Sequence, residues 1–502
     1  MHRVTPLIDQ LPYALYTAEQ VRALDRCAIE QFSIPGETLM QRAGQAVFEL
    51  LHRRWPEARV VTVACGIGNN GGDGYVVARR AREAGLKVHL LQLGDPRKLK
   101  GDALRMAQAY RDAGGEAHPF DVIPPATDVV VDAVLGTGLE RDVEGAWGAA
   151  LQAINDHRAP VLAVDIPSGL HSDTGCVMGV AVKASATISF IGLKRGMFTG
   201  AGRECCGEIH FDALEVPARV YATQILSARR VDWVQQATRL EPRPRNAHKG
   251  QFGHVLVVGG APGFAGAARM AGEAAARGGA GLTTIATHPD HAAVLNAGRP
   301  ELMVHGVGTA EDLRPLLKRA TVVALGPGLG QDAWAMGLYR EAMESGLPMV
   351  VDADGLNLLA HDAFHRYDWV LTPHPGEAAR LLGCEAAAIE ADRFKAAGDL
   401  QRRFGGAVVL KGAGTLIEGE GHRPPAVCSE GNPGMATGGM GDLLTGIIAA
   451  LMAQGFGPEE AATLGVCLHA AAADRAAARG ERGMLASDLL PHLRTLLNPS
   501  SV

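Results

Sequence analysis

The sequence lacks the features that mark several special classes of protein. Aromatic residues make up only 5% of the chain, and none of its eight cysteines forms a CxxC pair. No apolar run approaches the ~18 residues that a membrane-spanning helix needs, and the first sixteen residues have no continuous apolar core of the signal-peptide kind. These absences argue against a disulfide-rich secreted domain, a zinc ribbon and a membrane protein. They predict a soluble cytoplasmic protein with reduced thiols.

The charge balance gives no sign of a polyanionic partner. The formal net charge is −6 and charged residues make up 20% of the chain, so we expect neither nucleic acid nor membrane as a partner. Glycine is abundant, with 63 residues, as expected for a protein with many tight turns between strands and helices. A chain of 502 residues is too long for one core, so we expect more than one domain.

In the first part of the chain, short apolar segments alternate with helical patterns. We predict strands at 59–65, 87–93, 128–135, 160–165, 184–191 and 208–211, and helices starting at Thr17 and over 36–54, 73–84, 99–113 and 145–156. Continuous apolar strands between helices are typical of a parallel sheet covered on both faces. We therefore predict an α/β domain over residues 1–225.

The alternation lapses over 226–248. This segment ends in the Pro- and Arg-rich sequence EPRPRNAH (241–248), and we interpret it as a linker. A second α/β domain is predicted over 249–502. Its expected strands are 254–259, 282–287, 321–325, 348–351, 369–372 and 407–411, and its expected helices include 265–278, 442–454, 458–478 and 486–497. The sequence shows no internal repeat.

The segment 66–74, GIGNNGGDG, lies between a predicted strand and a predicted helix. It matches the GxGxxG dinucleotide pattern, which is weak evidence alone. Asn69, Asn70 and Asp73 add amides and a carboxylate, which favour a polar or cation site. The alternative is a tight turn in which Asp73 caps the helix.

Two later strands also end in polar residues. Asp132 is followed by GTGLERD (136–142), and Asp165 is followed by Ser168. Open α/β sheets bind ligands at the carboxyl ends of their strands, and oxygen ligands of this kind suit Na⁺, K⁺, Mg²⁺ or Ca²⁺. Lys194 follows another strand, where it is either an acid–base partner or a solvated surface lysine.

Together, GIGNNGGDG, VDAVLGTGLERD, VDIPSGL and FIGLKRGMFTG resemble the NAD(P)H-hydrate epimerase domain. The resemblance implies a Rossmann-like three-layer αβα fold, K⁺ bound by Asn70, Asp132 and Ser168, and an acid–base pair of Asp165 and Lys194. The residues that it assigns to the hydrated dinucleotide are Asn69, Asn70, Gly71, Gly72, Asp73, Gly136, Thr137, Gly138, Leu139, Glu140, Arg141, Asp142 and Asp165.

The second domain carries a glycine-rich stretch, GNPGMATGGMGDLLTG (431–446), that runs into an apolar helix. Glycines before a helix start expose backbone N–H groups to an anion, and Asp442 lies at that point as a possible base. The alternative is that Asp442 only caps the helix. Four more motifs follow predicted strands: GPGLG (326–330), DADGLN (352–357, with Asp354 expected as a helix cap), TPHPGE (372–377) and KGAGT (411–415). No Walker A motif is present.

These motifs, with HKGQFGHVLVVGG (248–260), resemble the ribokinase-like superfamily and within it the ADP/ATP-dependent NAD(P)H-hydrate dehydratases. The resemblance implies that Asp442 is the base and that the backbone of 439–441 forms an anion hole. It assigns ADP, with ATP as the other possible donor, to Lys411, Gly412, Ala413, Gly414, Thr415 and Gly441. Mg²⁺ is expected to bind together with the nucleotide. It assigns the hydrate to Ala267, Gly328, His374 and Asp442.

The sequence therefore predicts a two-domain enzyme that repairs NAD(P)H hydrates: one domain interconverts the R and S forms, and the other dehydrates the S form while ADP becomes AMP and phosphate. One alternative is a ribokinase-like small-molecule kinase fused to a dinucleotide-sensing domain. Another is a non-catalytic nucleotide-binding scaffold. We expect small-molecule partners and a homo-oligomer.

Overall fold

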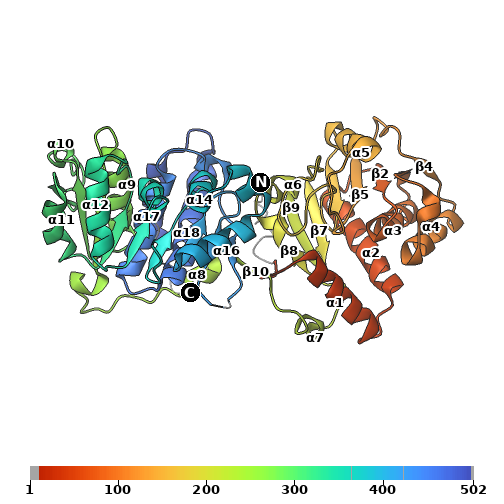
Figure 1. The fold of residues 1–502 in the computed structure, drawn as a ribbon. Helices are drawn as coiled ribbons and strands as arrows, with labels where there is room; N and C mark the ends of the chain where they lie inside the picture. The colour runs from red at the N-terminus through yellow and green to blue at the C-terminus, as the bar shows by residue number, and fades with distance from the viewer. Residues whose placement is uncertain (1–10, 363, 422, 499–502) are drawn as a thin grey trace. The chain divides into compact units, whose positions relative to one another are not determined.

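The structure, a computed structural model, describes residues 11–362, 364–421 and 423–498 in two compact units that divide between Arg229 and Arg230 (Figure 1). Residues 1–10, part of the segment in which no signal-peptide core was found, lie outside the described residues. The segment 226–248, predicted as a linker, contains the strand β10 (Ala228–Val231) and the short helix α8 (Trp233–Ala237). The boundary between the units falls inside β10.

The described part of unit 1 contains a seven-stranded parallel sheet with the order β4-β3-β2-β5-β6-β7-β9. The predicted strands are confirmed to within about two residues at their ends; β4 was not predicted. The strands are β2 (Val60–Cys65), β3 (Lys87–Gln92), β4 (Ala117–Pro119), β5 (Val129–Ala133), β6 (Val161–Val164), β7 (Ala186–Phe190) and β9 (Glu208–Asp212).

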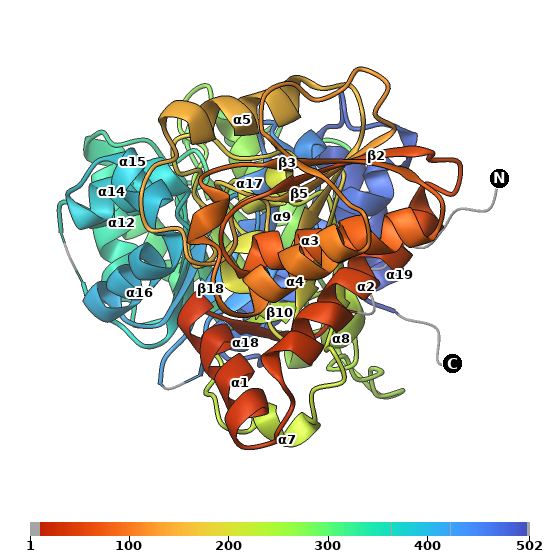
Figure 2. The same cartoon turned by 90° about the vertical axis from the view of Figure 1, so that its right-hand side faces the viewer.

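Helices cover both faces of this sheet, as a continuous apolar strand requires. Val61 and Val63 of β2 face a cluster with α1 (Ala18–Glu30), α2 (Gly36–Arg54), α3 (Asn69–Glu83) and α4 (Gly101–Asp112), whereas Ala64 packs with α5 (Gly145–Asp156). Figure 2 shows α2, α3 and α4 side by side. Thr17, the predicted start of the first helix, is the N-cap of α1 and forms a capping box with Gln20. The shorter elements are β1 (Ala14–Tyr16), η2 (Pro96–Lys98), β8 (Leu193–Lys194), η3 (Arg195–Phe198), α6 (Gly202–Cys205) and α7 (Ala218–Tyr221).

The main sheet of unit 2 is parallel from β13 to β17, in the order β13-β12-β11-β14-β15-β16-β17, and continues antiparallel through β18 and β19. The sequence analysis missed β13, β18 and β19, which are short. The strands are β11 (His254–Val258), β12 (Leu282–Thr287), β13 (Met303–Gly306), β14 (Val322–Leu325), β15 (Met349–Val351), β16 (Trp369–Leu371), β17 (Ala407–Leu410), β18 (Leu416–Glu418) and β19 (Ala426–Cys428).

One face of this sheet shares its core with α9 (Ala265–Arg277), α17 (Met440–Ala453), α18 (Pro458–Ala476) and α19 (Leu490–Leu496). The predicted helix 486–497 is two pieces, because η7 (Ala486–Leu489) precedes α19. Helix α11 contacts β12, α12 contacts β14, and α16 contacts β17. The remaining helices are α10 (Pro289–Ala292), α11 (Ala310–Leu317), α12 (Ala333–Glu344), α13 (Ala353–Leu359), α14 (Pro375–Leu382), α15 (Ala386–Ala391) and α16 (Arg393–Phe404), with η4 (Lys249–Phe252), η5 (Pro433–Met435) and η6 (Ala477–Arg479). None of the described helices combines the length and apolar character that a bilayer crossing requires.

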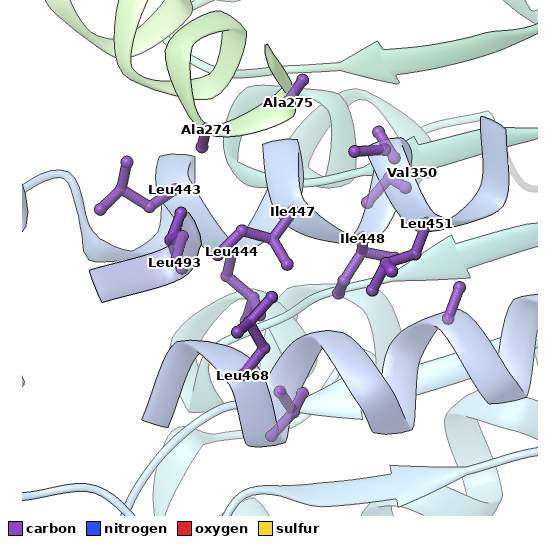
Figure 3. Close-up of a cluster of buried hydrophobic side chains, with 14 of the residues drawn as sticks. Ala274, Ala275, Val350, Leu443, Leu444, Ile447, Ile448, Leu451, Leu468 and Leu493 are labelled. Atoms are coloured by element: carbon purple, nitrogen blue, oxygen red, sulfur yellow. The ribbon is translucent and has the colours of Figure 1, made fainter. Parts of the chain in front are cut away.

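Helix α17 is the central element of this core. It is apolar on almost every side, as a fully buried helix is, and Figure 3 shows it between α9, which carries Ala274, and α18, which carries Leu468. Gly446 permits the close approach to α9, because a Cβ at this position would lie 2.1 Å from the carbonyl oxygen of Ala271.

Replacing Gly446 by Ala is expected to push α17 away from α9 and to lower the free energy of unfolding by about 1–3 kcal/mol. Chemical denaturation followed by circular dichroism measures this loss. Gly266→Ala in α9 is the matched control, because a Cβ there meets no heavy atom within 4 Å, and it is expected to leave stability unchanged or slightly raised. A Gly446→Ala variant as stable as the wild type would contradict the close packing.

Candidate active sites

Unit 1 has a cavity of about 930 Å³ at the carboxyl ends of β2, β5 and β6. Residues after β2 (Gly68, Asn69, Asn70, Asp73), after β5 (134–141) and after β6 (Asp165) line it. The three strand ends that the sequence analysis singled out therefore meet at one place. This is the edge at which open α/β sheets bind ligands.

The glycine-rich segment 66–74 is more helical than predicted. Helix α3 begins at Asn69 after the N-cap Gly68, four residues earlier than expected, so the interpretation of Asp73 as a helix cap is wrong. Asn69 and Asn70 instead occupy the first turn, where backbone N–H groups have no partner within the helix. The glycines keep the turn compact, since a Cβ at Gly71 would lie 2.1 Å from the carbonyl oxygen of Gly66.

Most residues that the resemblance assigns to the dinucleotide line this cavity. Gly71, Gly72 and Asp142 do not: Gly71 packs on Gly66, and Gly72 packs on Met40 and Ala103. Their assignment stays a prediction. The residues that do line it are Asn69, Asn70, Asp73, Gly136, Thr137, Gly138, Leu139, Glu140, Arg141 and Asp165.

The three predicted K⁺ ligands form a buried oxygen-rich group. Asp132, at 0% exposed, accepts hydrogen bonds from the backbone N–H (2.8 Å) and the hydroxyl (2.6 Å) of Ser168. Burial raises the pKa of Asp132 to about 6, although the bonds from Ser168 lower it. Asn70 donates to the carbonyl of Leu135 (3.0 Å), but its buried Oδ1 has no hydrogen-bond partner among the described residues. An orphaned amide oxygen near a carboxylate and a hydroxyl is a donor set that fits an alkali cation.

Asp165 and Lys194 form a buried ion pair at the cavity. The ammonium of Lys194 donates to Asp165 and to the hydroxyl of Ser189 (2.9 Å), and its side chain is fully buried, so the interpretation of Lys194 as a solvated surface lysine is wrong. The Phe190 N–H also donates to Asp165 Oδ1 (3.3 Å). Asp165 has φ = +67°, in the left-handed region that non-glycine residues rarely adopt. A strained carboxylate held by a buried lysine is typical of a functional site.

The sequence analysis missed several residues that line this cavity. One of them is the carboxylate-bearing residue Asp25 of α1. The signal was present in the sequence, because Asp25 stands four residues after Val21 and four before Ile29, within the apolar stripe of its helix. Other missed lining residues are Arg22, Leu39, Met40, Asp102, Trp147, Phe190, Ile191 and Leu214.

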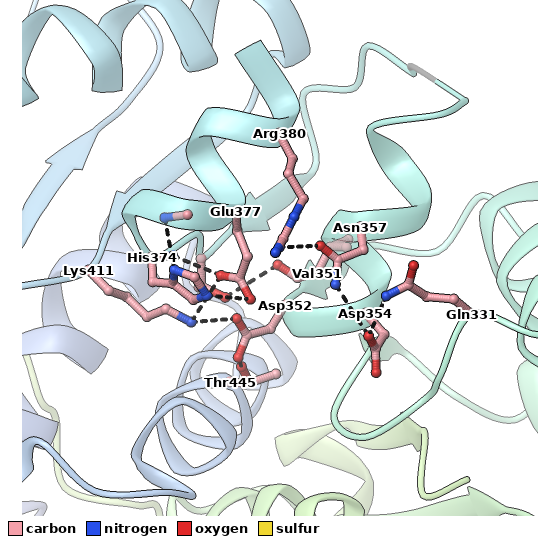
Figure 4. A network of polar contacts seen from close by, with 12 residues as sticks. Gln331, Val351, Asp352, Asp354, Asn357, His374, Glu377, Arg380, Lys411 and Thr445 are labelled. Carbon is pink, nitrogen blue, oxygen red and sulfur yellow. Dashed lines mark hydrogen bonds and ion pairs between the residues drawn. The ribbon is translucent and has the colours of Figure 1, made fainter. Parts of the chain in front are cut away.

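In unit 2, the ends of β15, β16 and β17 meet in a polar network (Figure 4). Lys411 Nζ donates to Asp352 Oδ1 (2.7 Å) and lies 3.7 Å from Glu377 Oε2, and the Thr445 hydroxyl donates to Asp352 Oδ2 (2.8 Å). Burial alone would raise the pKa of Asp352, but Lys411 and Thr445 hold it below its usual value. Burial raises the pKa of Glu377, although Lys411 opposes this.

The prediction that Asp354 caps a helix is wrong, because the N-cap of α13 is Asp352. Asp354 lies one residue inside the helix and accepts from the Gly330 N–H (2.8 Å) and from Gln331 Nε2 (3.2 Å). It therefore joins the GPGLG loop to DADGLN. His374 is the N-cap of α14 in a reciprocal capping box with Glu377, which holds it in place.

Asp442 lies in the first turn of α17, which begins at Met440 after the left-handed N-cap Gly439. The N-cap position is taken by Gly439, so Asp442 is not the N-cap residue. The interpretation of Asp442 as only a cap is therefore wrong. Among the residues that the structure describes, none forms a hydrogen bond or ion pair with the Asp442 carboxylate. Burial and the charge of Asp352 raise its pKa to about 6, although Lys411 lowers it. The arrangement suits a base beside exposed N–H groups.

Some of the predicted ligand-binding residues of unit 2 lie close together. A Cβ at Gly441 would lie 3.3 Å from both Asp352 Oδ2 and Lys411 Nζ, and one at Gly328 would lie 3.1 Å from Ala267 Cβ. The Lys411 ammonium is engaged by the carboxylates, so its predicted contact with the nucleotide remains a prediction. The same holds for the loop residues Gly412, Ala413, Gly414 and Thr415.

Comparison with known proteins decides the family. Residues 36–196 match the model described as YjeF-related protein N-terminus, and residues 255–494 match the NAD(P)H-hydrate dehydratase model. The bifunctional NAD(P)H-hydrate repair enzyme Nnr of Coxiella burnetii is 50% identical over 97% of this chain and 99% of its own length. The chain belongs to the family of bifunctional NAD(P)H-hydrate repair enzymes.

Two further comparisons agree with this family. The Nnr enzyme of Escherichia coli is 44% identical over 97% of this chain and 95% of its own length. A ribokinase-like superfamily protein from Enterococcus faecalis, 31% identical, matches 55% of this chain and 97% of its own with a TM-score of 0.50. The predicted α/β fold is confirmed, and the family assignment from the sequence motifs is confirmed.

Replacing Lys411 by Met is expected to lower the free energy of unfolding by about 3–5 kcal/mol, because it leaves the Asp352 carboxylate buried without its partner. Chemical denaturation at neutral pH measures the loss. In the double variant Asp352→Asn/Lys411→Met, no uncompensated charge remains at Asp352, and much of the stability should return. A double-mutant cycle with no coupling energy would show that the pair is not structural.

Proposed function

We propose that this chain repairs hydrated NAD(P)H at two separate sites. Unit 1 interconverts the R and S hydrates, and unit 2 dehydrates the S hydrate to NAD(P)H while ADP becomes AMP and phosphate. The family supports the pair of activities. The observation that carries the proposal is Asp442, a half-buried carboxylate at the start of α17 that has no hydrogen bond or ion pair with any described residue and whose pKa is raised to about 6.

For dehydration, Asp442 takes the proton of the hydrate hydroxyl, and the oxygen attacks the terminal phosphoryl group of the nucleotide. The backbone N–H groups of 439–441 stabilise the charge on that phosphoryl group. Phosphorylation turns a poor leaving group into a good one. The ring nitrogen then expels phosphate, and loss of a proton from the neighbouring carbon restores the dihydronicotinamide.

The cation expected with the nucleotide is Mg²⁺, bound through phosphate oxygens. Charge in the site supports this proposal, because three carboxylates (Asp352, Glu377, Asp442) surround a single lysine. A nucleotide brings further negative charge, which Mg²⁺ would neutralise when bound. The hydrate would lie along Ala267, Gly328 and His374, and the nucleotide along Gly441 and 411–415.

For epimerisation, Asp165 and Lys194 supply the acid–base groups in the cavity of unit 1. Asn70, Asp132 and Ser168 would hold K⁺, which when bound supplies positive charge beside the dinucleotide site. The fusion of the two activities has a chemical logic, because one unit produces the epimer that the other consumes. We further propose a cytoplasmic homo-oligomer with these small molecules as its partners.

Asp442→Asn should reduce NADH return from the S hydrate and ADP by about 10²–10⁴-fold, because the hydroxyl proton has no acceptor. The absorbance of NADH measures this loss. The same variant should exchange R and S hydrates at the wild-type rate, which chromatography measures. If exchange also stopped, the assignment of two separate sites would be wrong, and a stable phosphorylated hydrate would instead indicate a kinase.

Epimerisation should depend on K⁺. Replacing K⁺ by tetramethylammonium, which is too large for a site of protein oxygens, is expected to slow R/S exchange, and added K⁺ should restore it. The control is dehydration of the S hydrate by the same protein in the same buffers, which proceeds at the unit 2 site. Equal exchange rates in both salts would contradict the K⁺ site.

A further inference from the structure

Helix α1 presents one face to the cavity of unit 1. Val21, Asp25 and Ile29 follow one another at intervals of four residues, and all three line the cavity. The helix is fixed in place, because its capping box at Thr17 holds the first turn and the Ala18 N–H donates to Asp173 Oδ1 (2.7 Å). A carboxylate on this face of a fixed helix is held against whatever fills the cavity.

The carboxylate of Asp25 has no hydrogen bond or ion pair with any residue that the structure describes. Burial is the main cause that raises its pKa, the carboxylates of Asp165 and Asp102 raise it further, and Arg26 lowers it. Burying a carboxylate without a hydrogen-bond partner costs free energy, and groups of this kind cluster at functional sites. In the protein without substrate, nothing in the described residues accounts for it.

Charge around the cavity is unbalanced in the same direction. Five carboxylates line it against two arginines: Asp25, Asp73, Asp102, Glu140 and Asp165 against Arg22 and Arg141. The buried cation nearby, Lys194, is already bound by Asp165 and Ser189. The carboxylates of Asp25, Asp73 and Asp165 raise one another's pKa, which favours the protonated form of at least one of them. At least one of the unpaired carboxyl groups is therefore available as a proton donor.

We propose that Asp25 is a catalytic proton-transfer residue of the epimerase, acting on the oxygen that leaves the epimerised carbon. This inference rests on the proposed epimerase function. It adds a residue from α1, a helix that lies outside the family-model match over 36–196.

The step balances with water as the second reactant. The Asp25 carboxyl gives its proton to the hydroxyl of the hydrate, the C–O bond breaks with its electron pair going to oxygen, and water leaves. The lone pair of the ring nitrogen forms a C=N bond. A water then adds to the other face of this planar carbon, and its proton passes to the Asp165 carboxylate. Asp165 releases this proton to solvent, and solvent returns a proton to Asp25.

Asp73 is less suited to this role. Burial is the main cause that raises its pKa well above the usual value, and the carboxylates of Asp165 and Asp25 raise it further. Proton transfer needs a group that can both release a proton and regain it. Asp25 borders the cavity from a helix whose other side is exposed, from which solvent can return the proton.

The test compares Asp25→Asn, Asp25→Glu and Glu30→Gln in the full chain, with purified NADH hydrate epimers, K⁺ and no ADP. Glu30 is the matched control, because it is an exposed carboxylate on the same helix and does not line the cavity. Chromatography follows R/S exchange above the spontaneous rate. Asp25→Asn should lower kcat by about 10²–10³-fold with KM little changed, whereas Glu30→Gln should match the wild type.

The pH profile separates a chemical role from a structural one. The wild-type rate should fall as pH rises through the pKa of Asp25, because the donor form is lost; Asp25→Asn should lose this alkaline limb, and Asp25→Glu should keep it with part of the rate. A wild-type kcat in Asp25→Asn, a loss confined to KM, or an unchanged alkaline limb would each overturn the role of Asp25. Absence of exchange in the wild type would instead overturn the proposed epimerase function.

Discussion

The dehydratase site depends on the buried pairing of Asp352 with Lys411. Each residue follows a different strand of the sheet, and Thr445 of α17 completes the group by donating to the same carboxylate. The pair therefore joins two strand ends to the helix that carries Asp442. Because the group is buried, its geometry is held by charge as well as by packing. The position of the base relative to the exposed N–H groups follows from it.

Both units use a similar physical device, an excess of carboxylates around one lysine at the carboxyl end of a parallel sheet. In unit 1 the lysine is Lys194, and in unit 2 it is Lys411. The excess negative charge and the burial together raise the pKa of Asp25 and of Asp442. The raised pKa makes each of these carboxylates a better proton acceptor than an aspartate in water.

Much of this architecture was predictable because its signals are local. The strands of both sheets are short apolar runs, and helix α2 begins and ends at the predicted residues. The errors lie where tertiary contacts determine the secondary structure. Helix α3 begins at Asn69 because glycines allow close packing there. The strands β18 and β19 depend on their pairing partners more than on their own sequence. Asp25 was missed because a carboxylate in an apolar stripe has meaning only when the cavity beside it is known. The pairing of Asp352 with Lys411 joins residues 59 positions apart, which no sequence pattern specifies.

The left-handed backbone at Asp165 restricts which residue can stand there. That conformation is tolerated mainly by glycine, asparagine and aspartate. Of these three, only aspartate has a carboxylate with which to accept from Lys194. This position has two requirements, a residue that tolerates the left-handed backbone and a carboxylate that accepts from Lys194. Among these residues, aspartate alone meets both. Stability would favour glycine at this position, so the strained aspartate is a mark of selection for chemistry over folding.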